Sequence, residues 1–444
     1  MGQSEPPEAQ ERATNRVYWP WVGVLTALYL ILACCYLAWA PVLGGPDEDA
    51  HWQYVRVLRE QRRLPVLPRL AGPADQDRVA DQAQHPPLYY AVMAAVSCLY
   101  PQLDDTRAPR QMKLVSVLMG VATILATALL ARRLWPDDPG AALGAAGLVA
   151  LLPNVTYLTA LINNTAGSLL GSALALLALE RALRAPGLPW RPWALVGLAT
   201  GLAMLAKVTA VWLVPTVVLA LVLKAAAERR PSGAAVTAAT ATLLPVAALV
   251  GTWLLRNVLD FGEIMPERVV DRRYAPLGFM VMLFDSFALK LLLWVMAVSI
   301  PLSMVAPWWV LRTGVSHGVG MALLGVVMLP ALWGGILAVR RVHGRFFGHL
   351  SPRRMVLVAC VVAGIAAWGV ATQAVLHDWS AGLHAGRYAV EAAPALGLLW
   401  AAGLTHAFPR TGVRNLAILA GLGAILAMNV ATCLFLLRFF GGQT

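Results

Sequence analysis

The chain has 444 residues, of which 59% are hydrophobic and only 13% charged, and its mean hydropathy is +0.65. Soluble domains carry about 25% charged residues, so this composition excludes a soluble protein and indicates a polytopic, all-α membrane protein. The net charge of +12 would suit a nucleic-acid partner. However, the arginines cluster at the ends of apolar segments, which is the positive-inside pattern of membrane proteins. We therefore expect membrane lipids, and no nucleic acid, as partners.

The N-terminal part of the chain predicts a tail, a span and a long outer loop. Residues 1–16 are polar and are predicted to be a disordered cytoplasmic tail, while residues 17–444 form a single domain. The first span is expected over 19–41. Positive-inside counting then places the loop 43–109 outside the cytoplasm.

This first outer loop opens with GPDEDAHWQYVRVLREQRRLPVL, residues 45–67. We interpret it as an amphipathic helix on the membrane surface, with Pro46 in its first turn and acids where the helix dipole favours negative charge. Helical periodicity gives an apolar stripe of Ala50, Tyr54, Val57 and Leu58. Asp47 and His51 lie on or beside that stripe. A polar group facing the protein is costly unless it is paired or used.

The loop continues with HPPLYYAVMAAVSCLYP, residues 85–101, which is short for a span and is predicted to be interfacial or re-entrant. Ten more spans follow, for about eleven transmembrane helices in total. They are expected over 110–132, 140–158, 164–184, 192–206, 208–225, 235–258, 317–339, 355–376, 388–407 and 414–438. Lys207 marks the break between two of them. Residues 259–316 form a second outer loop, and its apolar stretch 287–310 is treated as interfacial because this keeps the later arginines inside.

This topology brings several polar groups to the outer face. They are Asp47, Glu48, His51, His85, Lys207, Arg256 and Arg387. Each has a plainer interpretation: solvated acids at a helix start, a histidine in a turn, a lysine that reaches the interface, or arginines that anchor span ends. Together they place acids opposite cations. Carboxylates activate a hydroxyl or bind a metal, and cations hold a phosphate, which suits group transfer from a lipid-linked phosphate donor.

Several motifs resemble a known family in the same order along the chain. The matching segments are PDEDAHWQYVRVLREQRRLPVL (46–67), HPPLYY (85–90), LINNTAGSLLGSALALL (161–177), GLAMLAKVTAVWLVP (201–215), WLLRNVLDFGE (253–263) and GRYAVEAAPALGLL (386–399). The chain resembles a GT-C-fold membrane glycosyltransferase of the protein mannosyltransferase and aminoarabinose transferase kind. Among these it is most similar to bacterial membrane proteins that carry a PDE-x-AH motif.

The resemblance implies an inverting glycosyltransferase in the cell membrane, with an active site outside the cytoplasm and a polyprenyl-phosphate sugar as donor. Asp47, the first acidic residue of the outer loop, would be catalytic and act on the acceptor or position it, with Glu48 as the adjacent family acid. Substrate binding would fall to His51, His85, Lys207, Arg256, Arg387 and Tyr388. The acceptor would be a glycan, a lipid or a protein of the envelope. Metal use varies across this group, so the resemblance leaves open whether a divalent metal ion is a cofactor.

The chain departs from that group at Asn163 and Asn164, where relatives often place a second outer acid. Two other functions remain open on the sequence: a transporter of lipid-linked sugars, and a non-catalytic membrane scaffold. A transporter would need polar residues through the middle of the membrane, whereas these acids are expected at the outer face.

Overall fold

The computed structural model describes residues 7–45, 47–99, 107–264, 317–343, 350–377 and 386–440. Regular structure in these ranges is helical, apart from an isolated bridge between Val66 and Val79. The second outer loop lies outside the described residues from residue 265 onward, and so does the stretch 287–310.

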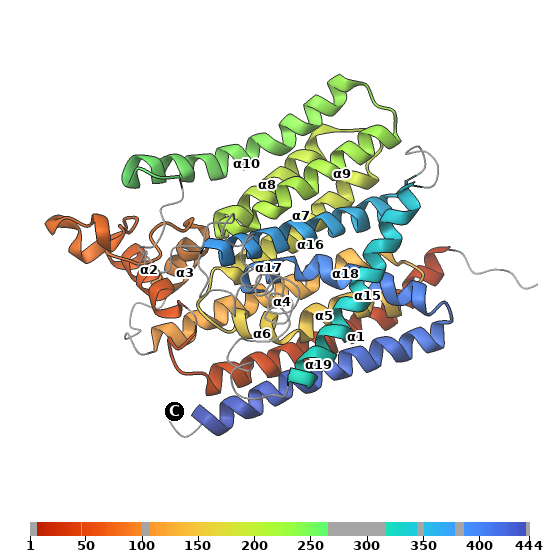
Figure 1. The fold of residues 1–444 in the computed structure, drawn as a ribbon, viewed down its shortest axis with the longest axis horizontal. Helices are drawn as coiled ribbons and strands as arrows, with labels where there is room; N and C mark the ends of the chain where they lie inside the picture. The colour runs from red at the N-terminus through yellow and green to blue at the C-terminus, as the bar shows by residue number, and fades with distance from the viewer. Residues whose placement is uncertain are drawn as a thin grey trace, which may run out of the picture.

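Long helices form a bundle in which most axes run side by side (Figure 1). In chain order they are α1 (Pro7–Trp39), α4 (Ala108–Leu134), α7 (Thr165–Arg184), α8 (Trp190–Ala206), α9 (Leu213–Ala227), α10 (Ser232–Phe261), α15 (His317–His343), α16 (Pro352–His377), α18 (Ala393–Ala407) and α19 (Thr411–Phe440). Between α4 and α7 lie α5 (Pro139–Leu151) and α6 (Pro153–Thr159). The bundle interior is a large apolar cluster that includes the buried indoles of Trp193, Trp212 and Trp400.

Each predicted span falls on helix, but the count of eleven is not confirmed. Among the described residues, seven helices are long and apolar enough to cross a membrane, or eight if α5 and α6 form one broken span. That pair bends by 53°. Leu152 is extended because Pro153 disfavours the helical conformation of the residue before it. The predicted break at Lys207 is confirmed, since this residue is extended between α8 and a short 3₁₀ segment, η3 (Val208–Trp212).

The predicted disorder of residues 1–16 is wrong for residues 7–16, which continue α1. The stretch from Glu8 to Ala13 contains strong helix formers and no glycine or proline. A helix already nucleated by the apolar segment therefore propagates backward through it.

Two shorter helices, α2 (Glu48–Gln61) and α3 (Leu88–Cys98), lie at one end of the bundle (Figure 1). The predicted amphipathic helix is α2, although it begins at Glu48, with Asp47 as its N-cap. Its apolar stripe packs against α3, so that Ala50, Tyr54 and Val57 are buried by protein. The apolar helix α3 has 11 residues, fewer than the roughly 20 that cross a bilayer.

Basic side chains gather at the opposite end of the bundle and neutralise buried acids there. Arg133 and Arg184 both pair with the buried Glu180. Arg414 pairs with Asp138, with 2.9 Å between Nη2 and Oδ2. These arginines lie in the last turns of α4 and α7 and at the start of α19. The N-terminal end of α1 and the C-terminal end of α19 lie at opposite ends of the bundle (Figure 1).

Candidate active site

The α2 end of the bundle collects polar side chains from segments far apart in sequence. They come from the start of α2, from α3, from the turn before α7, from Lys207, and from α17 (Gly386–Ala389) with the adjoining η8 (Val390–Ala392). Each of these segments is a helix terminus or a break in a helix. Such positions leave backbone groups unpaired and turn side chains toward the bundle end.

Asp47 and Arg387 form the pair closest to the predicted chemistry. Oδ2 of Asp47 lies 3.1 Å from Nη1 of Arg387, and both side chains are mostly buried. Nη2 of Arg387 donates a hydrogen bond of 3.0 Å to the hydroxyl of Tyr388. Asp47 has a φ of 57°, in the left-handed region, which aspartate tolerates better than most residues. This backbone conformation and the ion pair hold the carboxylate at the bundle end.

Lys207 is also paired, with an acid that sequence analysis did not find. Its ammonium nitrogen lies 3.0 Å from Oε1 of the fully buried Glu391 and donates to the Thr165 hydroxyl over 2.8 Å. Ser168 and Thr209 also donate to Glu391, over 2.9 and 2.7 Å. Burying an ion pair is tolerable only when further hydrogen bonds satisfy it, and here they do.

Tyr388 connects these two ion pairs. Its ring centre lies 5.3 Å from the ammonium of Lys207 and 5.0 Å from the guanidinium carbon of Arg387. Both distances are within the range of cation–π attraction. Asp47, Arg387, Tyr388, Lys207 and Glu391 therefore form one contiguous cluster with two cations and two acids.

His51 lies beside this cluster in a buried hydrogen-bond network. Its Nδ1 lies 2.8 Å from the hydroxyl of Tyr90, and its Nε2 lies 3.4 Å from Nδ2 of Asn163. The backbone N–H of Thr165 donates to Oδ1 of Asn163, so the Asn163 amide nitrogen faces the imidazole and donates to Nε2. Nδ1 therefore carries the His51 proton and donates to Tyr90. Asn164 also donates to the Tyr90 hydroxyl, over 3.2 Å.

The environment of His51 keeps the imidazole neutral. Burial lowers the pKa of His51 well below its usual 6.5, and His85 lowers it further, whereas Asp47 acts in the opposite direction. The ring centre of His85 lies 6.2 Å from that of His51. Both histidines predicted for substrate binding therefore lie next to each other, beside Asp47.

Glu48 has a different environment from its neighbour Asp47. Its side chain is fully buried, with Oε1 lying 3.0 Å from Nζ of the buried Lys113. Oε1 also accepts from the backbone N–H of Ile162, and Oε2 accepts from that of Gly45. Glu48 thus joins α2 to α4 and to the turn before α7.

Arg256 does not join the cluster around Asp47. It pairs with Asp260 over 2.6 Å and donates to the backbone carbonyls of Ala83 and Pro65 over 3.2 and 2.8 Å. These contacts bind the loop between α2 and α3 to the end of α10. The structure therefore brings together six of the predicted residues, Asp47, His51, His85, Lys207, Arg387 and Tyr388. The contacts of Arg256 run instead to Asp260 and to the loop that precedes His85.

Sequence analysis missed the partners of the predicted residues. Glu391 and Lys113 are charged residues within apolar segments, and that signal could have marked both of them. Tyr90 lies in the HPPLYY motif, but nothing in that motif shows that its hydroxyl faces His51. Asn163 was noticed only as a departure from related sequences.

The described side chains do not fit a metal ion. Within the described ranges, no group of three or more His, Cys, Asp or Glu side chains could hold one. Both ring nitrogens of His51 are engaged, and Asp47 is paired with Arg387.

Comparisons with known proteins agree on the fold. A family model described as dolichyl-phosphate-mannose-protein mannosyltransferase matches residues 84–253. The archaeal oligosaccharyltransferase AglB from Archaeoglobus fulgidus superposes with a TM-score of 0.56 at 14% identity, over 94% of this chain and 56% of that chain. This chain has a GT-C fold. Arabinofuranosyltransferase AftD from Mycobacteria superposes with a TM-score of 0.55 at 16% identity, over 94% of this chain and 27% of that chain.

The GT-C chain described here spans about half the length of AglB. No curated protein sequence matches it. The region that matches the family model contains His85, Tyr90, Asn163 and Lys207, whereas Asp47 and Arg387 lie outside it on either side. The Asp47 cluster thus combines residues of the segment that matches the family model with Asp47 and Arg387, which the fold brings next to that segment.

Proposed function

We propose that the chain is a glycosyltransferase that moves a sugar from a polyprenyl-phosphate donor to an envelope acceptor on the extracytoplasmic face of the membrane. The observation that carries this proposal is the pairing of Asp47 with Arg387, next to Lys207, at one end of a GT-C bundle. A carboxylate adjacent to two cations supplies a base for a hydroxyl and positive charge for a phosphate.

In the proposed reaction, Asp47 takes the proton from the acceptor hydroxyl as the acceptor oxygen attacks the anomeric carbon of the sugar. The bond between that carbon and the phosphate oxygen breaks, and its electron pair stays on the polyprenyl phosphate. Attack opposite the leaving phosphate inverts the anomeric carbon. Asp47 thus gains the proton of the acceptor and becomes neutral, while the polyprenyl phosphate gains one negative charge.

The Asp47–Arg387 pair suits this exchange of charge. When Asp47 accepts the proton, its carboxylate becomes neutral and no longer holds the guanidinium of Arg387. At the same moment the leaving phosphate gains a negative charge. Arg387 can then move its interaction from Asp47 to the phosphate, where its planar fork matches two oxygens. Lys207, held by Glu391, provides a second fixed positive charge.

Basic residues at the ends of the spans support the proposed orientation. The pairs of Arg133, Arg184 and Arg414 lie at the end opposite α2. We propose that this end is cytoplasmic, as the positive-inside rule favours, and that the Asp47 cluster lies at the outer surface. AglB has been solved with a dolichol-phosphate and an inhibitory peptide bound. A lipid phosphate as the donor of this chain agrees with that neighbour.

The proposal can be tested with the purified chain in proteoliposomes, supplied with radiolabelled polyprenyl-phosphate sugars and with envelope extract as acceptor. Mass spectrometry of envelope glycans from cells with and without the gene identifies the product. We expect transfer that requires Asp47 and release of polyprenyl phosphate. The proposal fails if Asp47→Asn transfers sugar as fast as the wild type, or if removing the gene leaves every envelope glycan unchanged.

A further inference from the structure

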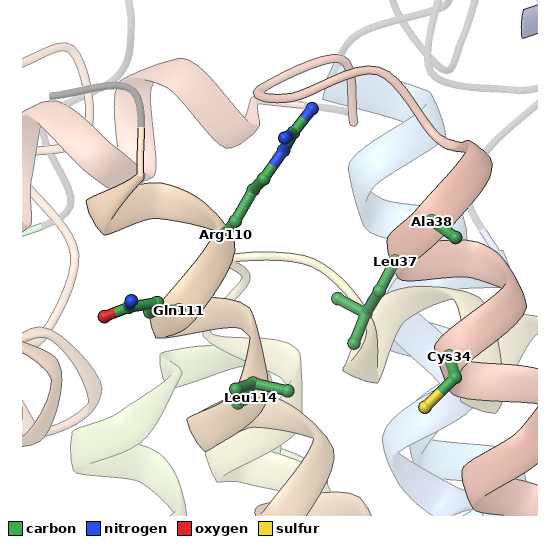
Figure 2. Close-up of a pocket in the computed structure, with 6 residues that line it drawn as sticks. All are labelled: Cys34, Leu37, Ala38, Arg110, Gln111 and Leu114. Carbon is green, nitrogen blue, oxygen red and sulfur yellow. The ribbon is translucent and has the colours of Figure 1, made fainter. Parts of the chain in front are cut away.

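A groove separate from the Asp47 cluster lies between α1 and α4 (Figure 2). It has a volume of about 430 Å³, within the range of ligand-binding pockets. Its lining comes from the last turns of α1 and the first turns of α4: Cys34, Leu37, Ala38, Arg110, Gln111 and Leu114. None of the residues predicted for catalysis or donor binding lines this groove.

The groove faces the surroundings of the bundle. Both α1 and α4 are candidate membrane spans. Leu114 is 50% exposed and Leu118, one turn further along α4, is 64% exposed. Cys34 and Ala38 are also exposed. Apolar side chains exposed on two spans face lipid, so the groove opens into the hydrocarbon of the membrane.

Arg110 stands at the polar end of this groove. Its side chain is exposed, and no hydrogen bond or ion pair joins it to another described residue. Two other cations at this end are paired: Lys113 with Glu48, and Arg387 with Asp47. Nor does the positive-inside rule account for Arg110, because it favours arginine at the opposite end of the bundle.

Figure 2 shows the arrangement of these side chains. The guanidinium of Arg110 extends beyond the helix toward the end of the groove, whereas Leu37, Leu114 and the sulfur of Cys34 lie along its length. A cation at one end of an apolar channel is complementary to a lipid, which has a phosphate at one end of its hydrocarbon chains. Arginine is especially suited to phosphate because its N–H groups match two oxygens.

We propose that this groove binds a phospholipid of the leaflet at the α2 end, with the phosphate on Arg110 and an acyl chain along Leu37 and Leu114. A bilayer phospholipid is the phosphate-bearing molecule that already surrounds these two helices. The cations proposed to hold the sugar donor belong to a different cluster. The proposal therefore does not depend on the glycosyltransferase activity.

Native mass spectrometry of the full chain tests the assignment. The delipidated protein is titrated with phosphatidylglycerol and, separately, with diacylglycerol that has the same acyl chains but no phosphate. Arg110→Gln removes the charge, and Ala38→Trp fills the groove. Arg63→Gln changes an exposed arginine in the loop after α2, and Val24→Trp adds an indole on the exposed face of α1 outside the groove. Thermal unfolding in detergent checks that each variant is folded.

We expect phosphatidylglycerol to bind the wild type, Arg63→Gln and Val24→Trp equally. Binding should weaken about tenfold or more in Arg110→Gln, since a hydrogen-bonded charge is lost. It should weaken similarly in Ala38→Trp. Diacylglycerol should bind all proteins weakly. Equal binding by folded Arg110→Gln, or equal binding of diacylglycerol to the wild type, overturns the proposal. Preferential displacement of phosphatidylglycerol by undecaprenyl phosphate overturns the choice of a bilayer phospholipid.

Discussion

Asp47 and Arg387 stand 340 residues apart in the sequence, yet their side chains meet over 3.1 Å at the α2 end of the bundle. This pair places a candidate base and a candidate phosphate ligand in direct contact. In the proposed reaction, negative charge passes from the Asp47 carboxylate to the leaving phosphate. The Arg387 guanidinium stays within reach of both groups. In that proposed reaction, the pair links acceptor activation to departure of the lipid phosphate.

Replacing Asp47 by Asn should lower kcat by about 10²–10⁴-fold, the usual contribution of a general base. The protein should remain folded, because Asn tolerates the left-handed conformation at this position. Steady-state transfer assays and thermal unfolding check the two parts. Asp49→Asn is the matched control, since Asp49 is an exposed acid of the same helix. Unchanged kcat in Asp47→Asn would exclude the assigned role.

Replacing Arg387 by Gln should chiefly weaken interaction with the donor and with the leaving phosphate. Loss of one charge-assisted interaction corresponds to about 10- to 100-fold in kcat/KM. Arg256→Gln tests an arginine that ties the loop between α2 and α3 to α10 instead. Its effect should appear in thermal unfolding more than in kcat/KM. If Arg256→Gln chiefly lowers kcat/KM and Arg387→Gln chiefly lowers the unfolding temperature, the donor site lies near Arg256.

The buried pair of Lys207 and Glu391 allows fold and function to be separated. Removing one charge of such a pair typically costs about 3–5 kcal/mol, so both Lys207→Met and Glu391→Gln should unfold at lower temperature. In the double variant, the amide that replaces the Glu391 carboxylate can still accept hydrogen bonds, and neither charge remains unpaired. Its unfolding temperature should exceed that of either single variant, while transfer stays low. If the double variant regains both sugar transfer and stability, Lys207 contributes to folding and not to catalysis.

Glu48 should behave differently from Asp47 although the two are adjacent. Glu48→Gln leaves the ammonium of Lys113 buried without its counter-charge, so we expect a loss of about 3–5 kcal/mol in the free energy of unfolding. Any loss of sugar transfer should be proportional to the loss of folded protein. Thermal unfolding and kcat per folded molecule distinguish the cases. A folded Glu48→Gln protein with a kcat as low as that of Asp47→Asn would indicate direct catalysis by Glu48.

The neutral, buried His51 should make the protein sensitive to acid. Because its pKa is lowered in the folded state, the unfolded chain binds more protons as the pH falls below 6.5. Stability should therefore fall with decreasing pH, by at most about 1.4 kcal/mol per pH unit for this one group. His51→Gln should reduce that slope between about pH 5 and 6.5. An unchanged slope would show that other groups cause the acid sensitivity.

Close contact between α8 and α10 depends on Gly197. A Cβ at this position would collide with the backbone carbonyl of Thr242, and overpacking of this kind costs about 1–3 kcal/mol. Gly197→Ala should therefore lower the unfolding temperature. Gly364→Ala is the matched control, because nothing lies within 4 Å of a Cβ there. Equal effects of the two variants would show that α8 and α10 can separate at little cost.

By itself, the sequence determined the class of protein, the positions of its helices, the break at Lys207 and the placement of Asp47 at a helix start. These properties depend on hydrophobicity and on neighbouring residues, so they can be deduced locally. The sequence also suggested that acids and cations meet at the outer end, because alternating spans fix which loops share a face. The sequence predicted a disordered tail over residues 1–16, but residues 7–16 are helical. Helix propagation from the apolar segment outweighed the polarity of these residues.

Only the tertiary structure decided which charges pair. Lys207 has no acid near it in the sequence, and its partner Glu391 comes from another segment. Arg256 and Arg387 looked equivalent at the ends of spans, but only Arg387 reaches Asp47. Glu48 and Asp47 are adjacent, yet one joins Lys113 and the other Arg387. Such choices depend on how the helices pack and on which side chains packing brings within a few ångströms, and local sequence does not encode those distances.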